Sequence, residues 1–218
     1  MALALFDLDE TLISSDSDHE WGQYVADHAL VDVDAHREKN DAFYEDYKAG
    51  VLDIDEYLTF SCSVLTQYNM DELHQHRAVF FHERITPIIL PKAEALVNQH
   101  REQGDTLVVI TSTIEFITRP IVDHFGIETL IAPMPEIQNN RYTGSITGTP
   151  SFGSGKVTRL NEWLIDTGHP RDPSYFYSDS HNDLPLLRLV THPVAVDPDA
   201  KLKTEAEKNQ WSIISLRT

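Results

Sequence analysis

Short apolar runs that end at polar residues recur along this chain and constrain its fold more than any other feature. The first is Leu3–Phe6. Continuous apolar runs of this length are typical of strands buried on both faces of a parallel sheet. Further strands are expected at 106–110, 130–132, 175–177 and 193–196, and helices between them at 92–103, 114–125, 156–166 and 184–190. This alternation predicts the α/β class, with a doubly wound, mostly parallel sheet.

A long helical segment interrupts the alternation directly after the first strand. Apolar residues recur at a spacing of three to four between positions 17 and 84, and Gly50 and the acids at 53–55 mark a helix end and a helix start. We therefore expect an α/β core formed by residues 1–15 and 86–218, with a helical cap formed by residues 16–85 inserted into it. A hairpin is expected between 136 and 149.

Composition excludes several classes of function. The 218 residues carry a formal charge of −18, and 41% of them are hydrophobic, which suits a folded core rather than a disordered chain. The acidic excess argues against nucleic-acid or anionic-membrane partners, because both need clustered Lys and Arg. The lone Cys62, the short apolar start and the lack of an apolar run of ~20 residues predict a cytoplasmic protein without disulfides. Nothing in the sequence indicates an oligomeric state.

Acidic and hydroxyl residues directly follow three of the expected strands. In chain order they are Asp7 and Asp9, Thr111 and Ser112, and Asp179 and Asp183. Ligands of open α/β sheets bind at the carboxyl ends of the strands, so these side chains are expected to converge. Four carboxylates in one crevice repel one another unless a cation holds them, and oxygen ligands without Cys or His are typical of Mg²⁺. Any one of these Asp residues alone is as readily a helix cap.

The Asp7-Leu8-Asp9 spacing suits a two-carboxylate reaction. Residues two apart on an extended segment point the same way, so both acids can face one substrate atom. One can attack phosphorus as a nucleophile while the other transfers protons. Lys156 lies near the start of its expected helix, where a cation can neutralise a phosphate. Taken alone, it is more simply a solvated surface lysine.

Together these motifs resemble those of the haloacid dehalogenase (HAD) superfamily of phosphatases. Residues 6–12 resemble its Asp-x-Asp-x-Thr signature, residues 108–112 its second motif, Lys156 its third, and residues 178–187 its fourth. A helical cap between the first two motifs, with a fourth motif of the form Ser-x-Asn-Asp-Leu-Pro, is similar to the phosphoserine-phosphatase-like branch, subfamily IB. The resemblance covers the whole chain.

The resemblance implies a role for each matching residue. Asp7 would be the nucleophile that forms an aspartyl-phosphate, and Asp9 would protonate the leaving alcohol and then activate water. Thr111 and Lys156 would hold the phosphoryl group. The Mg²⁺ ligands implied are Asp7, the Asp9 carbonyl and Asp179, with Asp183 as a ligand or beside them.

The cap is expected to select a small phosphorylated metabolite. Amino-acid phosphatases of this family place an acid a few residues after the first motif to meet a substrate ammonium, and Asp16 falls there. Their phosphoserine members carry an arginine-rich cap segment, but the comparable residues 56–64 contain no arginine. The substrate-binding residues expected are Asp16, Asp18, Phe60, Ser112 and Asn182.

These features rank the candidate substrates. Without a paired cation, a buried substrate carboxylate is costly, which favours an amine-bearing ester such as histidinol phosphate, with an aromatic side chain stacked on its ring. The cap is acidic, with 16 Asp or Glu against 4 Lys or Arg in residues 16–83, which also suits a cationic substrate. A phosphoserine phosphatase, a phosphotransferase and a non-enzymatic phospho-acceptor remain as alternatives.

Overall fold

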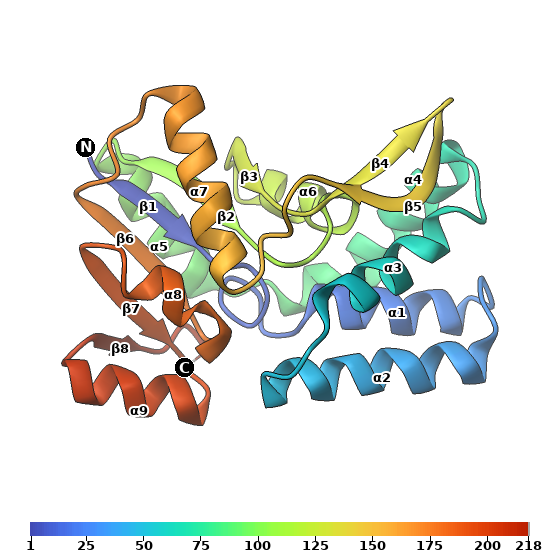
Figure 1. Cartoon of the computed structure of the whole chain (residues 1–218), viewed down its shortest axis with the longest axis horizontal. Coiled ribbons are helices and arrows are strands. Elements are labelled where there is room, and N and C mark those ends of the chain that lie inside the picture. The colour runs from blue at the N-terminus through green and yellow to red at the C-terminus, as the bar shows by residue number, and fades with distance from the viewer. Residues whose placement is uncertain (218) are drawn as a thin grey trace.

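The computed structural model describes residues 1–217, and the core within them is a parallel sheet covered by helices (Figure 1). Its strands pair in the order β3-β2-β1-β6-β7-β8, and each neighbouring pair runs parallel. The strands are β1 Leu3–Phe6, β2 Thr106–Ile110, β3 Thr129–Ile131, β6 Ser174–Ser178, β7 His192–Val196 and β8 Ser212–Ile214. The expected doubly wound α/β fold is confirmed.

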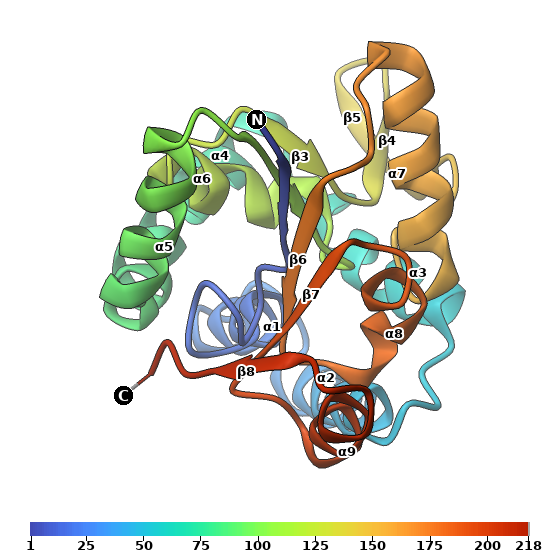
Figure 2. The same cartoon turned by 90° about the vertical axis from the view of Figure 1, so that its left-hand side faces the viewer.

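Helices cover both faces of this sheet, as Figure 2 shows. They are α5 Pro91–Glu102, α6 Glu115–His124, α7 Ser154–Thr167, α8 Leu184–Leu187 and α9 Ala200–Asn209. Successive side chains of a strand point to opposite faces. Accordingly, Ala4 and Phe6 of β1 join an apolar cluster with residues of α5 and α6, whereas Leu3 and Leu5 join a second cluster with residues of α7, α8 and α9. Strand β1 is therefore buried between two helical layers.

Four further helices lie between β1 and α5 in the chain and stand beside the core in Figure 1. They are α1 Ser17–Asp27, α2 Val33–Ala49, α3 Ile54–Leu65 and α4 Met70–Phe80, followed by a π-helical turn η1 Phe81–Ile85 and a 3-10 turn η2 Thr86–Ile88. Each of the four begins at an Asp or Asn whose side chain accepts hydrogen bonds from the first turn. Several of the acids in this segment are thus helix caps: Asp16, Asp32 and Asp53.

The two chain segments that join these helices to the core run side by side. The Ser14 amide donates to the Ile88 carbonyl at 2.9 Å, and Ile13 pairs with Ile89 in an antiparallel bridge. We keep residues 16–85 as the proposed cap, because both connections then lie at this one bridge.

A β-hairpin lies at the position expected from its turn residues. It consists of β4 Met134–Gln138 and β5 Arg141–Thr147, joined by Asn139 and Asn140, which both adopt positive φ. The hairpin packs against α3. The cap therefore rests on a projection of the core as well as on the two connections.

The C-terminal part of the core was not expected from the sequence. Helix α9 buries only Leu202 and Ala206, a pair four residues apart, and β8 is a three-residue edge strand with mostly exposed side chains. Elements this short, or with so few apolar residues, show no clear hydrophobic period in the sequence, and they depend on packing against β7. Among the described residues, no helix combines the length and apolar content of a membrane span.

Candidate active site

The carboxyl ends of three adjacent strands place Asp7, Thr111 and Asp179 at one edge of the sheet. Strand β1 lies between β2 and β6, and these residues directly follow the three strands. The Asp7 amide donates to the Tyr177 carbonyl at 2.9 Å, which extends the pairing of β1 with β6 up to the acid. All three side chains are buried. The convergence expected from the strand order is therefore present.

Lys156 lies between two of the carboxylates. Its Nζ donates to Asp7 Oδ1 at 2.9 Å and to Asp183 Oδ2 at 2.8 Å, and its side chain is 3% exposed. Although burial opposes the charged form, Asp183 and Asp7 raise the pKa of Lys156, so it stays a cation. A Cβ on Gly155 would lie 2.0 Å from the Pro150 carbonyl oxygen, so the close approach that seats the start of α7 requires glycine.

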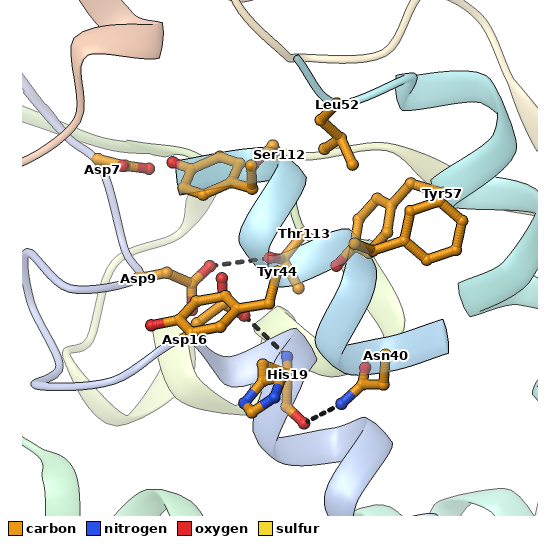
Figure 3. Close-up of a pocket in the computed structure, with 12 residues that line it drawn as sticks. Asp7, Asp9, Asp16, His19, Asn40, Tyr44, Leu52, Tyr57, Ser112 and Thr113 are labelled. Carbon is orange, nitrogen blue, oxygen red and sulfur yellow. Dashed lines mark hydrogen bonds between the residues drawn. The ribbon is translucent and has the colours of Figure 1, made fainter. Parts of the chain in front are cut away.

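Asp9 directs its carboxyl group toward the cap helix α1 and the loop after β2. Oδ2 accepts from the hydroxyl of Thr113 at 2.8 Å (Figure 3). It also accepts from the hydroxyl of Thr111 at 3.3 Å, and Oδ1 accepts from the Ser17 amide at 2.7 Å. Burial raises the pKa of Asp9 above its ordinary value, against the effect of these hydrogen bonds. A carboxyl group held in place with a raised pKa is suited to acid and base catalysis.

Asp7 and Asp179 are buried carboxyl groups with other acids close to them. Burial raises the pKa of Asp7 to about 8, with Lys156 opposing and Asp183 and Asp9 adding to the shift. Burial, and then repulsion from Asp7, raises the pKa of Asp179 well above its ordinary range. Thr11 fixes Asp179 by donating to its Oδ1 at 2.9 Å and accepting from its amide at 3.1 Å. A cation is needed to keep both carboxylates ionised.

The carboxylate oxygens at this edge of the sheet suit a hard cation such as Mg²⁺, although their side chains do not already form a metal-binding cluster. Among residues 1–217, no three Asp, Glu, His or Cys side chains are grouped closely enough to form one. Two of the expected acids are engaged elsewhere: the Asp9 carboxyl binds hydroxyl groups, and Asp183 Oδ2 accepts from Lys156 and from Ser178 at 2.8 Å. Asp7 and Asp179 share this buried edge, and although their Oδ1 atoms accept from Lys156 and Thr11, their Oδ2 atoms remain to contact an ion.

A pocket extends from these acids into the cap. Asp7, Asp9, Ser112 and Thr113 line it on the core side, and α1, α2 and α3 supply the other walls (Figure 3). The cap residues that line it are Asp16, His19, Asn40, Phe43, Tyr44, Tyr47, Leu52 and Tyr57. The lining is therefore acidic next to the sheet and aromatic in the cap, and it contains no Lys or Arg among the described residues.

Two of the expected substrate-binding residues, Asp16 and Ser112, line this pocket, and three do not. Asp18 is buried behind the wall, where it accepts from Ser61 at 3.1 Å. Asn182 donates to the Tyr47 carbonyl at 3.1 Å and so contacts the backbone of α2.

Phe60, which was expected to bind substrate, does not line this pocket. Its ring stacks on His36 with centroids 4.6 Å apart and lies 5.3 Å from Phe43, so it packs between α2 and α3. Tyr57, one turn earlier on α3, reaches the pocket instead. Both residues fit an aromatic face of α3, and only the position of α2 decides which one is covered.

One face of α2 was not recognised as part of the site. Asn40, Phe43, Tyr44 and Tyr47 all line the pocket, and their spacing of three, one and three places them along one side of a helix. The same spacing is typical of a helix packed on a core. The sequence contains one sign of this face: three of its four residues are aromatic, although the helix as a whole is strongly polar.

The chain is similar in sequence to known hydrolases along its whole length. The model of the haloacid dehalogenase-like hydrolase family matches residues 4–188. A histidinol-phosphatase of Neisseria meningitidis serogroup C (strain 8013) is 47% identical over 219 residues, which cover 99% of each chain.

Solved structures repeat the fold. A protein of unknown function from Bordetella pertussis Tohama I superposes with a TM-score of 0.93 at 40% identity, covering 99% of this chain and 98% of that one. A substrate-bound phosphoserine phosphatase superposes with a TM-score of 0.71 at 15% identity, covering 99% and 92%. At that identity, the second similarity shows the shared fold alone.

Proposed function

The chain belongs to the haloacid dehalogenase-like hydrolase family and is a phosphatase, and from this premise we propose which residues carry the reaction. Asp7 is the nucleophile, because it is the acid at the centre of the sheet edge and holds an ion pair with the buried Lys156. Its carboxylate oxygen attacks phosphorus, the ester oxygen leaves, and an aspartyl-phosphate forms on Asp7. The Asp7–Lys156 pair is the observation that carries this assignment.

Asp9 transfers the protons of both steps. In its protonated form it donates a proton to the departing alcohol oxygen, and it then accepts a proton from the water that hydrolyses the aspartyl-phosphate. Its raised pKa supports the first role, and the hydroxyl group of Thr113 keeps its Oδ2 oriented. We infer that Lys156 donates to the phosphoryl oxygens, and that Thr111 does so by turning its hydroxyl proton away from Asp9.

Mg²⁺ is the proposed cofactor, held by Asp7, Asp179 and the Asp9 carbonyl, with Asp183 beside them. When bound, it neutralises phosphate charge and orients the phosphoryl group. The raised pKa values of Asp7 and Asp179 support it, because a divalent cation removes the repulsion between these buried acids. Asp183 supports the site through its hydrogen bonds with Lys156 and Ser178.

The proposed substrate is histidinol phosphate. The full-length similarity to a histidinol-phosphatase supports it, as does a pocket that offers the acid Asp16 for an ammonium and aromatic walls for a ring. Phosphoserine, the second candidate, would place its carboxylate in a pocket whose described lining holds no Lys or Arg to pair with it. We therefore rank histidinol phosphate first.

A phosphate-release assay tests both the proposed substrate and the proposed mechanism. With Mg²⁺ we expect a kcat/KM for histidinol phosphate at least tenfold above that for phosphoserine, loss of turnover in EDTA, and recovery when Mg²⁺ is restored. Asp7→Asn, which keeps the size of the side chain, should abolish turnover. A preference for phosphoserine would overturn the substrate, and an active Asp7→Asn variant would overturn the mechanism. Transfer of phosphate to an added alcohol in place of water would indicate a phosphotransferase.

A further inference from the structure

Asn40 is a buried amide in the wall of the pocket. It lies on α2, lines the pocket and is 5% exposed. Its Nδ2 donates to the His19 carbonyl of α1 at 3.0 Å, and because a carbonyl can only accept, this contact fixes which way the amide is turned. Among residues 1–217 no group donates to Asn40 Oδ1, and Figure 3 shows this oxygen turned toward the side of the pocket where Tyr57 lies. The oxygen is therefore an acceptor left for a molecule in the pocket.

A glycine of α1 makes room for this amide. A Cβ on Gly22 would collide with the side chain of Asn40, coming within 2.6 Å of Nδ2 and closer still to Oδ1. Glycine inside a helix is less favourable than alanine, and here the close approach of the amide to the α1 backbone requires it. The contact with Gly22 and the hydrogen bond to His19 together hold Oδ1 in one position.

The place of Asn40 in the pocket indicates which part of a substrate it meets. Figure 3 shows Asp7 and Asn40 on opposite sides of the pocket, with Asp16 between them. The backbone of His19 connects the last two, because its amide donates to Asp16 Oδ1 at 2.8 Å and its carbonyl accepts from Asn40. Histidinol phosphate carries its groups in the same order: phosphate, ammonium, imidazole. With the phosphoryl group at Asp7 and the ammonium at Asp16, the ring reaches Asn40.

Aromatic side chains beside Asn40 suit the faces of such a ring but not its polar edge. Phe43 and Tyr44 follow Asn40 by three and four residues, so they lie on the same face of α2. Tyr57 of α3 meets Phe43 edge to face, with centroids 5.5 Å apart. An imidazole N–H lies in the plane of its ring, and burying it without an acceptor is costly. Asn40 Oδ1 supplies an acceptor within this aromatic wall.

Resting on the proposed function, we propose that Asn40 is a specificity residue whose Oδ1 accepts a hydrogen bond from the N–H group of the substrate's imidazole ring. Gly22 is the positioning residue that seats the amide. At pH 8 an imidazole with its ordinary pKa of ~6.5 is neutral and carries one such proton. A ring without an N–H group leaves Oδ1 buried without a partner, so the site selects against it. Stacking on aromatic side chains alone would not distinguish the two rings.

Two substrates that differ only at the ring N–H test this contact. They are histidinol phosphate and 2-amino-3-(thiazol-4-yl)propyl phosphate, in which sulfur replaces the N–H group. The quantity measured is the ratio of the kcat/KM of the first to that of the second at pH 8. Asn40→Leu keeps the size of the side chain and should lower this ratio about tenfold, because the ring N–H then has no acceptor. An unchanged ratio in a folded Asn40→Leu protein overturns the proposal.

Gln23→Leu is the matched control. Gln23 Nε2 donates from α1 to Asp41 Oδ1 of α2 at 2.9 Å, so this variant also removes an amide that joins the two helices. Gln23 does not line the pocket, and the ratio in Gln23→Leu should equal that of the wild type. A fall as large as that in Asn40→Leu would show that the packing of α1 on α2 sets the ratio, and the proposal would fail.

A second variant leaves Asn40 in the chain. In Gly22→Ala the added Cβ displaces the amide, while alanine favours the helical conformation of α1. The ratio should fall here as well, and this result decides the question if Asn40→Leu does not fold. A wild-type ratio in Gly22→Ala would contradict a fixed acceptor at this position.

The substrate analogue 3-(imidazol-4-yl)propyl phosphate, which lacks the ammonium, shows which group Asn40 meets. Asn40→Leu should leave the ratio of kcat/KM for histidinol phosphate to that for this analogue unchanged, because both carry the imidazole. If this ratio falls while the thiazole ratio stays constant, Oδ1 serves the ammonium, and its assignment to the ring is overturned.

Binding separates this inference from the proposed function. In the Asp7→Asn background with Mg²⁺, titration calorimetry gives the Kd of the thiazole compound relative to that of histidinol phosphate, with and without Asn40→Leu. If the wild type does not hydrolyse histidinol phosphate, the proposed substrate fails, while a relative Kd that falls about tenfold on Asn40→Leu still supports the ring contact. If hydrolysis is present and neither the kcat/KM ratio nor the relative Kd responds to Asn40→Leu, the inference alone fails.

Discussion

Replacing the buried Asp18 by asparagine should stabilise the protein at neutral pH. Burial raises the pKa of Asp18 from its ordinary value of 3.8 to about 6, which means that its charged form is disfavoured in the folded state. Each pKa unit corresponds to ~1.4 kcal/mol, so ionisation of Asp18 lowers the free energy of unfolding by roughly 3 kcal/mol above pH 6. Asparagine has a similar shape and can still hydrogen bond with Ser61, so the variant keeps this contact without the charge.

The sign and the pH window follow from the raised pKa. Between the two pKa values the folded state binds more protons than the unfolded state, so the stability of the wild type falls as the pH rises from about 4 to 6. The advantage of Asp18→Asn should be roughly 3 kcal/mol at pH 8, about half of that at pH 5, and absent below pH 4. Urea denaturation in EDTA at several pH values measures the difference, and EDTA keeps metal binding out of the comparison.

An exposed acid provides the matched control. Asp172 accepts from Thr191 and Arg171, which lower its pKa, so Asp172→Asn should lose stability above the ordinary pKa of aspartate. The two variants are therefore expected to shift the urea midpoint in opposite directions at pH 8. An Asp18→Asn protein that is less stable than the wild type at pH 8, or a stability difference that is the same at pH 5 and pH 8, would refute the reasoning.

Other substitutions separate catalysis, stability and substrate contact. Asp9→Asn should lower kcat by ~10²–10⁴-fold in steady-state assays, because it removes the proton donor while keeping its size. Lys156→Met leaves Asp7 and Asp183 without their shared cation, and urea denaturation in EDTA should show a loss of ~3–5 kcal/mol. Phe60→Leu should leave kcat/KM for histidinol phosphate within about twofold, because Phe60 packs outside the pocket; a tenfold loss would place it in contact with substrate.

The order of strands and helices in the core could be predicted because local patterns determine it. Buried strands such as Leu3–Phe6 and Thr106–Ile110 are continuous apolar runs, and parallel strands joined by helices end at the same edge of the sheet. The acids that follow those strands therefore lie together at that edge, and the details of side-chain packing do not change this. Helix α9 and strand β8 could not be predicted in this way, because they bury few side chains and their position depends on packing against β7.

By itself, then, the sequence determined the parallel core, the helical insert and the meeting of Asp7 with Asp179 at the ends of β1 and β6. Only the tertiary structure decided what the cap contributes. Tyr57 and Phe60 are both aromatic residues on α3, but α2 covers Phe60 with His36 and leaves Tyr57 to the pocket, with Asp18 behind it. Periodicity tells which residues share a helix face, whereas the angle at which two helices pack tells which part of that face remains open.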